Sequence, residues 1–224
     1  MPEQADNTRR MYAYFTKTRK LPAEVIGELV HAKLLYQSTK FGNAVFVHRD
    51  ESGKAIGAEI QGTNSFKRYK GMAAGTGDSV FRFMPYPSAK GSKPVKAYIF
   101  ESAIDMMSFY SFCKDKSKLK DVLFLSMAGL KPTVPKRLQE QGVKIISCVD
   151  NDDAGRRFEA ENHFERTGFV RDHLDLLGFK DWNEALVYQS MNPGLDMKQL
   201  IQDAKNSIRL GEYTPVQHLT GRRK

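Results

Sequence analysis

The sequence predicts an α/β protein in which an α/β domain with a parallel sheet follows a smaller α+β subdomain. Beyond residue 95, short apolar runs alternate with segments of helical periodicity, as in the β–α units of parallel sheets. Before that point, two short helical segments precede strand-like runs that are separated by turn signals. The stretch Pro85–Pro94, rich in Pro, Gly and Lys, lies between the two patterns and is typical of a linker.

The change of pattern predicts three parts. We expect a basic N-terminal α+β subdomain over residues 1–95 and a parallel-sheet α/β domain over residues 96–190. A helix and a basic tail are expected over residues 191–224. The last residues, Thr214–Lys224, end in Gly-Arg-Arg-Lys, which is typical of a disordered or phosphate-contacting extension.

Size and composition exclude several classes of protein. The chain has 224 residues, of which 41% are hydrophobic, enough for a buried core and too many for a disordered tail. It has no run of about 18 apolar residues, and residues 1–20 have no apolar core of signal-peptide length. Cys113 and Cys148 are too few for a disulfide framework or a four-cysteine zinc site. We therefore expect a cytoplasmic protein with no membrane partner and no zinc.

The net charge of +9 is concentrated in the first half of the chain. Residues 1–97 contain 16 basic and 8 acidic residues, a net charge of +8, whereas residues 98–224 contain 19 basic and 18 acidic residues, a net charge of +1. A basic surface attracts phosphate backbones through counterion release. Charge alone is explained equally well by solubilising lysine, so it indicates nucleic acid only together with other features.

In the N-terminal part, helices are expected at Met11–Lys17 and at Ala23–Val30, where Pro22 suits the first turn. The turn signal Arg49–Lys54 predicts a hairpin. The basic run Lys67–Lys70 borders a glycine-rich loop, Gly71–Gly77. Runs of apolar and β-branched residues predict strands at Leu34–Gln37, Ala44–His48, Ala55–Gln61 and Val80–Phe83.

In the C-terminal part, strands and helices alternate. The expected strands are Ala97–Phe100, Val122–Leu125, Val143–Val149 and Val170–Leu174. The expected helices are Ser102–Cys113, Pro135–Gln141, Ala154–Arg166 and Asn183–Tyr188. In a parallel sheet, ligands bind at the carboxyl ends of the strands, so these ends are where functional residues are expected.

Acidic residues follow two of these strands. Glu101 ends the first, and the third is followed by Asp150-Asn151-Asp152-Asp153-Ala154-Gly155. Three neighbouring carboxylates repel one another unless a cation lies among them. Oxygen ligands of this kind suit Mg²⁺, which is commonly bound by one or two carboxylates together with substrate phosphates.

Other interpretations of the segment Asp150–Gly155 are possible. Asp150, Asp152, Gly155 and Glu161 have the spacing of a calcium loop, but Ala154 stands at a ligand position and a strand precedes the loop. A phosphatase-type strand with an aspartate nucleophile fits the spacing of the acids, although a hydroxyl or β-branched residue would be expected in place of Ala154. A plain helix N-cap at Asp153 is compatible with every interpretation.

A combination of motifs favours one interpretation. Tyr98–Asp105 reads Tyr-Ile-Phe-Glu-Ser-Ala-Ile-Asp, Asp150-x-Asp152 follows, and Lys180–Glu184 reads Lys-Asp-Trp-Asn-Glu. Together they resemble the Toprim fold shared by bacterial-type (DnaG-like) primases and topoisomerases, in which one strand ends in a Glu-Gly-x-x-Asp motif and another in Asp-x-Asp. Ser102 departs from the usual glycine of that motif. The last motif resembles the Lys-Asp-x-Asn/Asp signature of primase Toprim domains.

The resemblance implies metal-dependent phosphoryl transfer. Glu101, Asp150 and Asp152 would bind Mg²⁺ (or Mn²⁺), and Asp181 would be an additional acid near the metals. Asp105 is the second acid of the first motif and is expected to belong to the catalytic group. Glu101 would bind a metal or act as general acid or base. From the third motif, Lys180 and Asn183 would contact the nucleotide, and Trp182 is expected to pack beneath the site.

The resemblance extends upstream and covers about residues 11–190. Tyr14–Ile26 is similar to the opening of the primase catalytic core, and Lys67-Arg68-Tyr69 to a Lys-Tyr before a loop of that core. Lys67, Arg68 and Lys70 are therefore expected to bind nucleic acid or nucleotide, a solvated hairpin end being the alternative. Tyr69 is expected to pack in the core, with base stacking as the alternative.

The resemblance implies a primase-like enzyme that makes RNA primers on single-stranded DNA from nucleotide triphosphates. The arrangement resembles primase-like Toprim proteins of plasmids and mobile elements, whose partners would include a replicative helicase or a relaxase. The cysteine count argues against the zinc ribbon of bacterial primases. A Toprim nuclease, which keeps the fold but not the reaction, stays open as an alternative. A non-catalytic nucleic-acid-binding module also stays open, because Ser102 and Asn183 depart from the pattern.

Overall fold

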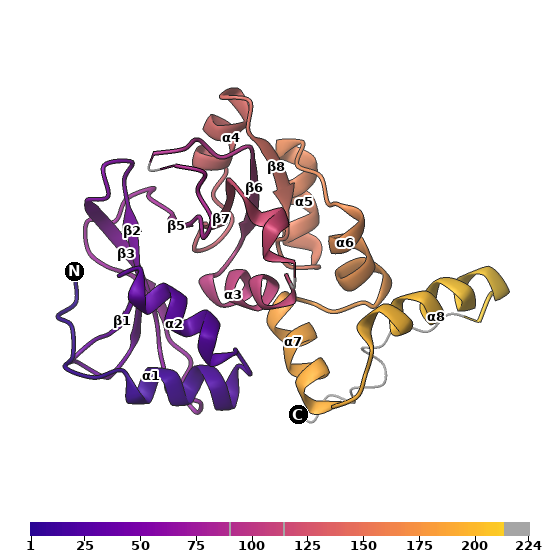
Figure 1. Ribbon diagram of the computed structural model, residues 1–224, viewed down its shortest axis with the longest axis horizontal. Coiled ribbons are helices and arrows are strands. Elements are labelled where there is room, and N and C mark those ends of the chain that lie inside the picture. Colours follow the sequence, from indigo (N-terminus) through magenta and orange to yellow (C-terminus); the bar gives the residue numbers. More distant parts are fainter. Residues whose placement is uncertain (90, 114, 213–224) are drawn as a thin grey trace.

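Two four-stranded sheets are formed by the residues that the structure describes, 1–89, 91–113 and 115–212 (Figure 1). The structure is a computed structural model. The predicted basic tail, Thr214–Lys224, lies outside the described residues. The mixture of helices with a sheet that contains parallel strands confirms the predicted α/β class.

The first sheet is antiparallel and belongs to the basic half of the chain. Its strands run in the order β1, β2, β3, β4. They span Leu35–Gln37, Ala44–Arg49, Ala55–Gln61 and Lys70–Met72. The helices α1 (Arg9–Ala13) and α2 (Ala23–His31) precede it, with a π-helical turn at Tyr14–Thr18 between them. Buried side chains of these helices pack with those of β1 and β2 in one core.

The second sheet has the strand order β5, β7, β6, β8. These strands span Phe81–Phe83, Val122–Ser126, Lys96–Phe100 and Lys144–Ser147. The strand β6 is parallel to both β7 and β8, whereas β5 pairs antiparallel with β7. Because β6 and β8 are parallel neighbours, their carboxyl ends lie side by side. The strand β5 belongs to this sheet although it precedes the linker expected from the sequence.

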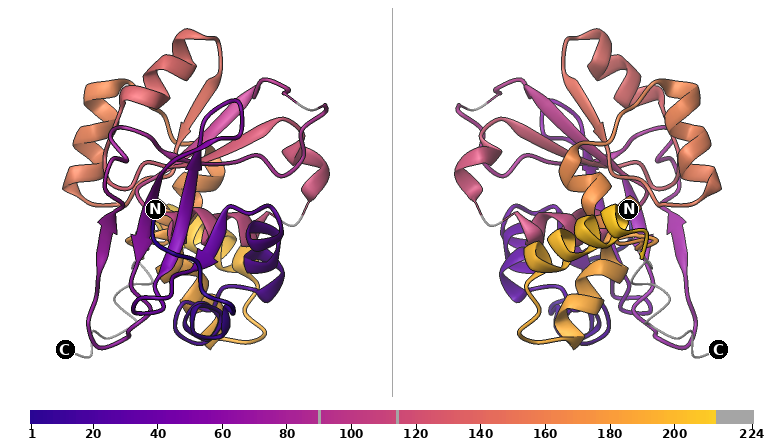
Figure 2. Two further views of the ribbon diagram at one scale, coloured as in Figure 1. Left: turned by 90° about the vertical axis from the view of Figure 1, so that its left-hand side faces the viewer. Right: turned by 90° about the vertical axis from the view of Figure 1, so that its right-hand side faces the viewer.

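Helices cover both faces of the second sheet (Figures 1 and 2). One face packs with α3 (Ala103–Phe112) and α7 (Trp182–Met191), and the other with α4 (Thr133–Glu140) and α5 (Asp153–Asn162). All five residues of β7 are buried, as expected for a strand covered on both faces. The last helix, α8 (Met197–Leu210), extends away from the rest of the fold (Figure 1).

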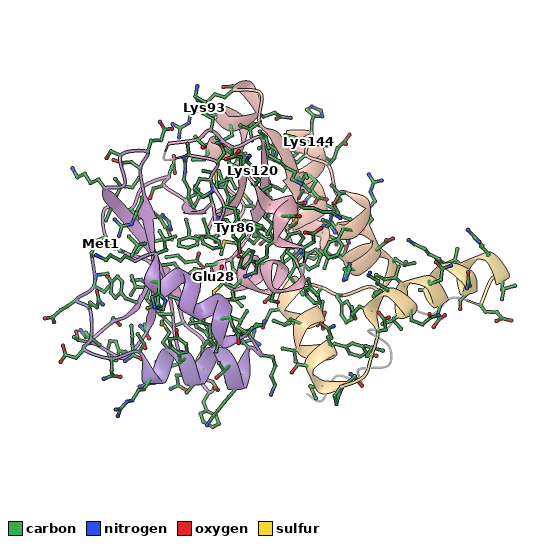
Figure 3. The ribbon with its side chains drawn as sticks, in the orientation of Figure 1. Met1, Glu28, Tyr86, Lys93, Lys120 and Lys144 are labelled. Carbon is green, nitrogen blue, oxygen red and sulfur yellow. The ribbon has the colours of Figure 1, made fainter. Side chains whose placement is uncertain are left out.

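A polar network joins the two halves where α2 meets α3, near the labelled Glu28 and Tyr86 of Figure 3. The Tyr110 hydroxyl donates to Glu28 Oε2 over 2.6 Å, and Lys116 Nζ pairs with Glu28 Oε1 over 2.7 Å. The Tyr86 and Tyr110 hydroxyls are 3.4 Å apart. These contacts fix the first subdomain against the helix that begins at the acidic strand end.

Two sequence-based expectations about secondary structure were wrong. The segment Val170–Leu174, predicted as a strand, lies in α6 (Gly168–Val170) and the π-helical Arg171–Leu176. Val170, Leu174 and Leu177 are all buried, and their spacing is that of one helix face. The predicted glycine-rich loop begins inside β4, which is recognisable only by its pairing with β3.

No helix among the described residues is long and apolar enough to cross a membrane.

Candidate metal and nucleic-acid site

Acidic side chains from three motifs gather at the carboxyl edge of the second sheet. Glu101 directly follows β6, and the Asp150 backbone N–H donates to Glu101 Oε1 over 3.2 Å. Asp105 and Asp181 join them around a cavity of about 280 Å³. The structure therefore brings together Glu101, Asp105, Asp150 and Asp181, which come from separate strand and helix ends, whereas Asp152 does not line this cavity. The cavity is lined by Arg19, Gln61, Arg68, Tyr69, Lys70, Glu101, Ser102, Ile104, Asp105, Asp150, Asp181 and Asn183.

The start of α3 holds Asp105 in place. Ser102 is the N-cap: its hydroxyl accepts from the Asp105 backbone N–H over 3.2 Å and donates to the Asp105 carboxylate. The Asn183 backbone N–H also donates to that carboxylate, over 3.2 Å. The departure from glycine at Ser102 thus supplies a helix cap, which serine favours. Asp105 is buried as a result, with 9% of its surface exposed.

The start of α5 holds Asp152. Its carboxylate accepts from the backbone N–H groups of Ala154 and Gly155, over 3.1 and 3.0 Å. Asp152 is therefore the N-cap, and the expectation that Asp153 caps the helix was wrong. Asp153 instead pairs with Arg156 on the surface. Because α5 begins at Asp153, the segment cannot wrap around an ion as a calcium loop does, so that alternative is excluded.

The third motif brings a lysine between the two aspartates. Lys180 Nζ lies 3.7 Å from Asp150 Oδ2 and 3.8 Å from Asp152 Oδ2. The Asp181 carboxylate caps α7 by accepting from the Glu184 backbone N–H over 2.7 Å, and Glu184 Oε2 accepts from the Lys180 backbone N–H over 2.6 Å. The arrangement differs from a capping box in that Glu184 accepts from the residue before the cap, and the two bonds tie Lys180 and Asp181 to the first turn of α7.

Burial and mutual repulsion favour the protonated form of several of these acids. Burial, followed by the charges of Asp181 and Asp150, raises the pKa of Asp105 to about 8. Burial, followed by Glu101 and Asp181, raises the pKa of Asp150 to about 7, although Lys180 acts in the opposite direction. The pKa of Glu101 is also raised, chiefly by burial. Burial is the larger cause for each of these acids, and repulsion from the neighbouring carboxylates adds to it.

A divalent cation fits this set of donors. Lys180 already places one positive charge between Asp150 and Asp152, and the raised pKa values indicate that a further cation would relieve repulsion. Carboxylate oxygens are the ligands that Mg²⁺ prefers. As the described side chains stand, however, no group of three or more His, Cys, Asp or Glu residues is arranged to hold an ion. Asp181 already lines the cavity, whereas Asp152 does not, so a metal site that includes Asp152 would require this side chain to turn toward the cavity.

The electrostatics predict how stability depends on pH. An acid whose pKa is raised on folding stabilises the fold below its unfolded pKa, and this contribution is lost as the pH rises through the folded pKa. For Asp105 and Asp150, with folded values of about 8 and about 7, the free energy of unfolding of the metal-free protein should fall between about pH 4 and pH 8. Urea unfolding in EDTA across this range measures the fall.

The variant Asp105→Asn provides the control for that measurement, because it removes one of the two titrating groups and keeps the size of the side chain. Its free energy of unfolding should fall less between these pH values than that of the natural protein. Addition of Mg²⁺ at pH 8 should restore part of the lost stability, since an ion that binds only the folded state stabilises it. An equal fall of the free energy of unfolding with pH in the two proteins would contradict the electrostatic interpretation.

The basic run Lys67–Lys70 lies between two hollows. Arg68 and Lys70 line the acidic cavity, Lys67 lines a second cavity of about 720 Å³, and Tyr69 lines both. Lys70 Nζ donates to the Glu101 carbonyl oxygen over 3.1 Å. Tyr69 is 49% exposed, so the expectation that it packs in the core was wrong. Its exposed ring fits the alternative, base stacking.

The second cavity combines cations with an exposed aromatic ring. Arg10, Lys40 and Lys67 line it together with Phe41. Phe41 is 68% exposed and has a φ of +66°, a left-handed conformation that is unfavourable for a bulky residue. Strained and exposed apolar residues of this kind are concentrated at functional sites. No sequence signal identified Phe41, because its exposure results from the turn between β1 and β2.

The Asn183 side chain makes hydrogen bonds to other residues of the protein. Its Oδ1 accepts from Arg19 Nη1 over 3.2 Å, and its Nδ2 donates to the Arg19 carbonyl oxygen over 2.9 Å and to Ser108 Oγ over 3.0 Å. The side chain is buried, with 5% exposed. It therefore fastens the N-terminal π-helical turn to α3 and α7, whereas the sequence had assigned it to nucleotide contact.

Arg166 supports the site and was missed by the sequence analysis, which had placed it at the end of a helix. Its side chain is 6% exposed and pairs with Glu159 over 2.8 Å and with Asp175 over 2.7 Å. Its Nη2 also donates to the carbonyl oxygens of Val149 and Asp150, over 3.3 and 3.2 Å. Arg166 thus holds the backbone that carries Asp150. The carbonyls that it holds lie 17 and 16 residues earlier in the chain, so no local pattern pointed to them.

Two family models match parts of the chain. The family model described as Toprim-like matches residues 98–186. These residues form a Toprim-like domain. Residues 13–89, ahead of the Toprim-like domain, match a family described as a protein of unknown function, DUF3991. Each family model covers less than half of the chain.

Two relatives match different lengths of the chain. An uncharacterized Bacillus anthracis protein named pXO2-78 is 30% identical over 213 residues, which cover 81% of this chain and 58% of that protein. A 65 kDa protein of Zymomonas mobilis is 30% identical over 119 residues, 52% of this chain and 20% of its own length. The chain thus spans little more than half of the first relative and a fifth of the second.

The fold is shared with a solved primase fragment. The primase fragment of the bacteriophage T7 primase-helicase protein aligns over 76% of this chain and 68% of its own, with a TM-score of 0.50 and 20% sequence identity. At this identity the likeness establishes the fold. The alignment extends beyond the 89 residues of the Toprim-like domain and therefore includes part of the first subdomain.

Proposed function

We propose that the protein is a primase-like nucleotidyltransferase, which uses Mg²⁺ or Mn²⁺ to join ribonucleotides on single-stranded DNA. One observation carries the proposal: a carboxylate-lined cavity lies directly beside a basic and aromatic segment, and Tyr69 lines the hollow on each side. A phosphate chain bound along that segment would reach the acids. The Toprim-like domain and the fold of the T7 primase fragment support it.

The residues can be given distinct roles. Glu101, Asp150 and Asp152 would hold the metal ions, with Asp181 beside them. Bound ions would polarise the phosphate and lower the pKa of the attacking hydroxyl. Asp105, held by Ser102 and Asn183, would keep the start of α3 in position. Glu101, whose pKa is raised, would alternatively accept the proton of that hydroxyl.

Cations at the edges of both cavities would hold phosphates. Arg68 and Lys70 would contact the nucleotide triphosphate over the acids, since both line the acidic cavity. Lys67, Lys40 and Arg10 would bind the template backbone in the larger cavity. Lys180 would release Asp150 and Asp152 to the metal and turn toward a phosphate. A helicase or relaxase partner and a role in plasmid replication or transfer, in the cytoplasm, complete the proposal.

A primer-extension assay tests this function. The purified chain is incubated with single-stranded DNA, labelled ribonucleotides and Mg²⁺ or Mn²⁺. Labelled oligoribonucleotides should appear with the natural protein and be absent with Glu101→Gln. A labelled DNA strand in the same reaction distinguishes the alternative, because a Toprim nuclease would shorten it. DNA binding with neither product, across templates and metals, would favour a non-catalytic binding module.

The template cavity makes a separate prediction. Phe41→Ala should weaken binding of single-stranded DNA by about tenfold, because stacking of a base on an aromatic ring contributes about 1–3 kcal/mol. Fluorescence anisotropy with a labelled oligonucleotide measures the affinity. Phe66→Ala is the matched control: Phe66 is fully exposed but does not line the cavity, so its loss should change the affinity less than twofold, about 0.4 kcal/mol. Equal effects of the two substitutions would argue against a template site in this cavity.

A further inference from the structure

Glu59 is a buried carboxyl group to which the proposed reaction gives no role. It lies in β3 of the first sheet, and only 1% of its surface is exposed. Burial raises its pKa, while Lys70 and a hydrogen bond from Ser126 act in the opposite direction. Because burying a carboxyl group is unfavourable unless it is hydrogen-bonded, the partners of Glu59 indicate why it is there.

Those partners belong to the second sheet. The Ser126 hydroxyl donates to Glu59 Oε2 over 2.8 Å, and the Ala103 backbone N–H lies near enough to the same carboxyl group to lower its pKa. Ser126 is the last residue of β7, and Ala103 is the first residue of α3. The first N–H groups of a helix have no partner within it, so Glu59 offers the Ala103 N–H an acceptor from the other sheet.

The turn between β6 and α3 is thus held from the first sheet at two points. The Glu101 carbonyl oxygen accepts from Lys70 Nζ over 3.1 Å and from the Gly129 N–H over 2.8 Å. Lys70 lies in β4, which pairs with β3 so that Glu59 is opposite Met72. Two neighbouring strands therefore contact the turn. Lys70 of β4 donates to the Glu101 carbonyl oxygen, and the Glu59 carboxyl group of β3 lies at the first helical N–H.

We propose that Glu59 is a positioning residue that fixes the β6–α3 turn, so that Glu101 and Asp105 face Asp150. The importance of these acids rests on the proposed function, whereas the contact itself does not. Loss of the Glu59 carboxyl group would leave the Ala103 N–H and the Ser126 hydroxyl buried without a partner. The turn would then open more often, and the acids would be less well placed for a metal ion.

Amide hydrogen exchange on the full chain tests the positioning. Glu59→Ala should speed exchange of the backbone amides at residues 103–105 by about tenfold, as expected when buried polar groups lose their partner. Glu59→Gln should stay within about threefold of the natural protein, because an amide can accept from the Ala103 N–H and donate to the Ser126 hydroxyl. If Glu59→Ala does not fold, Ser126→Ala, which removes one donor alone, should raise exchange at the same amides by a smaller factor.

Gln37→Ala is the matched control. Gln37 is also a buried polar residue of the first sheet, with 7% exposed, but its Oε1 accepts from the Met11 backbone N–H within the first subdomain. Its substitution should lower stability without changing exchange at residues 103–105 beyond the loss of global stability. Similar exchange at these amides in Glu59→Ala and Gln37→Ala would overturn the proposal, since Glu59 would then contribute only to general stability.

Mn²⁺ binding, measured by calorimetry, connects the position of the turn to the acids. Glu59→Ala should weaken Mn²⁺ binding by about tenfold, about 1.4 kcal/mol, while Gln37→Ala and Glu59→Gln should leave the affinity nearly unchanged. Faster exchange together with unchanged Mn²⁺ affinity would also overturn the proposal, because the turn would not matter to the acids. A natural protein that binds no Mn²⁺ would contradict the proposed function, and amide exchange would still decide the role of Glu59.

Discussion

Asp150→Asn is expected to abolish the proposed nucleotidyl transfer and to make the metal-free protein more resistant to unfolding at pH 8. The substitution keeps the size of the side chain and removes the charge that would bind the metal. Metal ions contribute several kcal/mol to phosphoryl transfer, so extension should fall by about a thousandfold or more. At the same time one of the mutually repelling acids disappears, and the folded state loses that repulsion.

The two effects have opposite signs, which makes the result informative. A general loss of structure would lower both activity and the melting temperature. Here the melting temperature in EDTA should rise by about 2–4 °C for each kcal/mol of repulsion removed. Differential scanning calorimetry and the extension assay on the same samples measure both. Asp153→Asn is the matched control, because Asp153 is exposed and pairs with Arg156 on the surface; both quantities should stay near those of the natural protein.

Gly155→Ala is expected to damage the site through the backbone. A Cβ atom at this position would lie 2.1 Å from the Asp150 carbonyl oxygen, closer than atoms can approach, and 3.2 Å from Val149 Cγ2, a tight contact. The start of α5 would therefore move away from the backbone at Asp150. Arg166 would lose its hydrogen bond to the Asp150 carbonyl oxygen. Overpacking of this kind destabilises proteins by about 1–3 kcal/mol.

We expect the displaced Asp150 to lower primer extension by at least about tenfold at saturating metal, because misplacement by about 1 Å can reduce rates a hundredfold. Gly168→Ala is the control: a Cβ atom there meets nothing within 4 Å, and its φ is not in the left-handed region. That variant should retain activity. Full activity of Gly155→Ala would show that the close approach of α5 to Asp150 is not needed. Urea unfolding distinguishes loss of stability from loss of activity.

The fold class and the position of the acids could be predicted because each depends on local pattern. Alternating apolar runs and helical segments indicated a parallel sheet, and the carboxyl ends of neighbouring parallel strands meet at one edge. Glu101 and Asp150 could therefore be expected together before their contact was known. Trp182, expected to pack beneath the site, is fully buried with its ring 4.6 Å from that of Phe109.

Supporting residues could not be predicted, because their roles arise from long-range contacts. Glu59 binds Ser126, and Arg166 binds the carbonyls at residues 149 and 150; neither pair is close in sequence. The segment Val170–Leu174 shows the limit of a short apolar run, which fits a strand or a buried helix equally. Asn183 carries the expected motif, yet its hydrogen bonds serve the packing of the subdomains.

The pairing of β5 with β7 has a consequence for how the protein is made. During synthesis, Phe81–Phe83 leaves the ribosome before Val122–Ser126, so β5 waits without its partner until the later strand emerges. A fragment that starts after residue 95 would leave the edge of β7 uncovered, and bare strand edges promote aggregation. The Toprim-like domain should therefore be produced soluble only when the segment from about residue 80 is included.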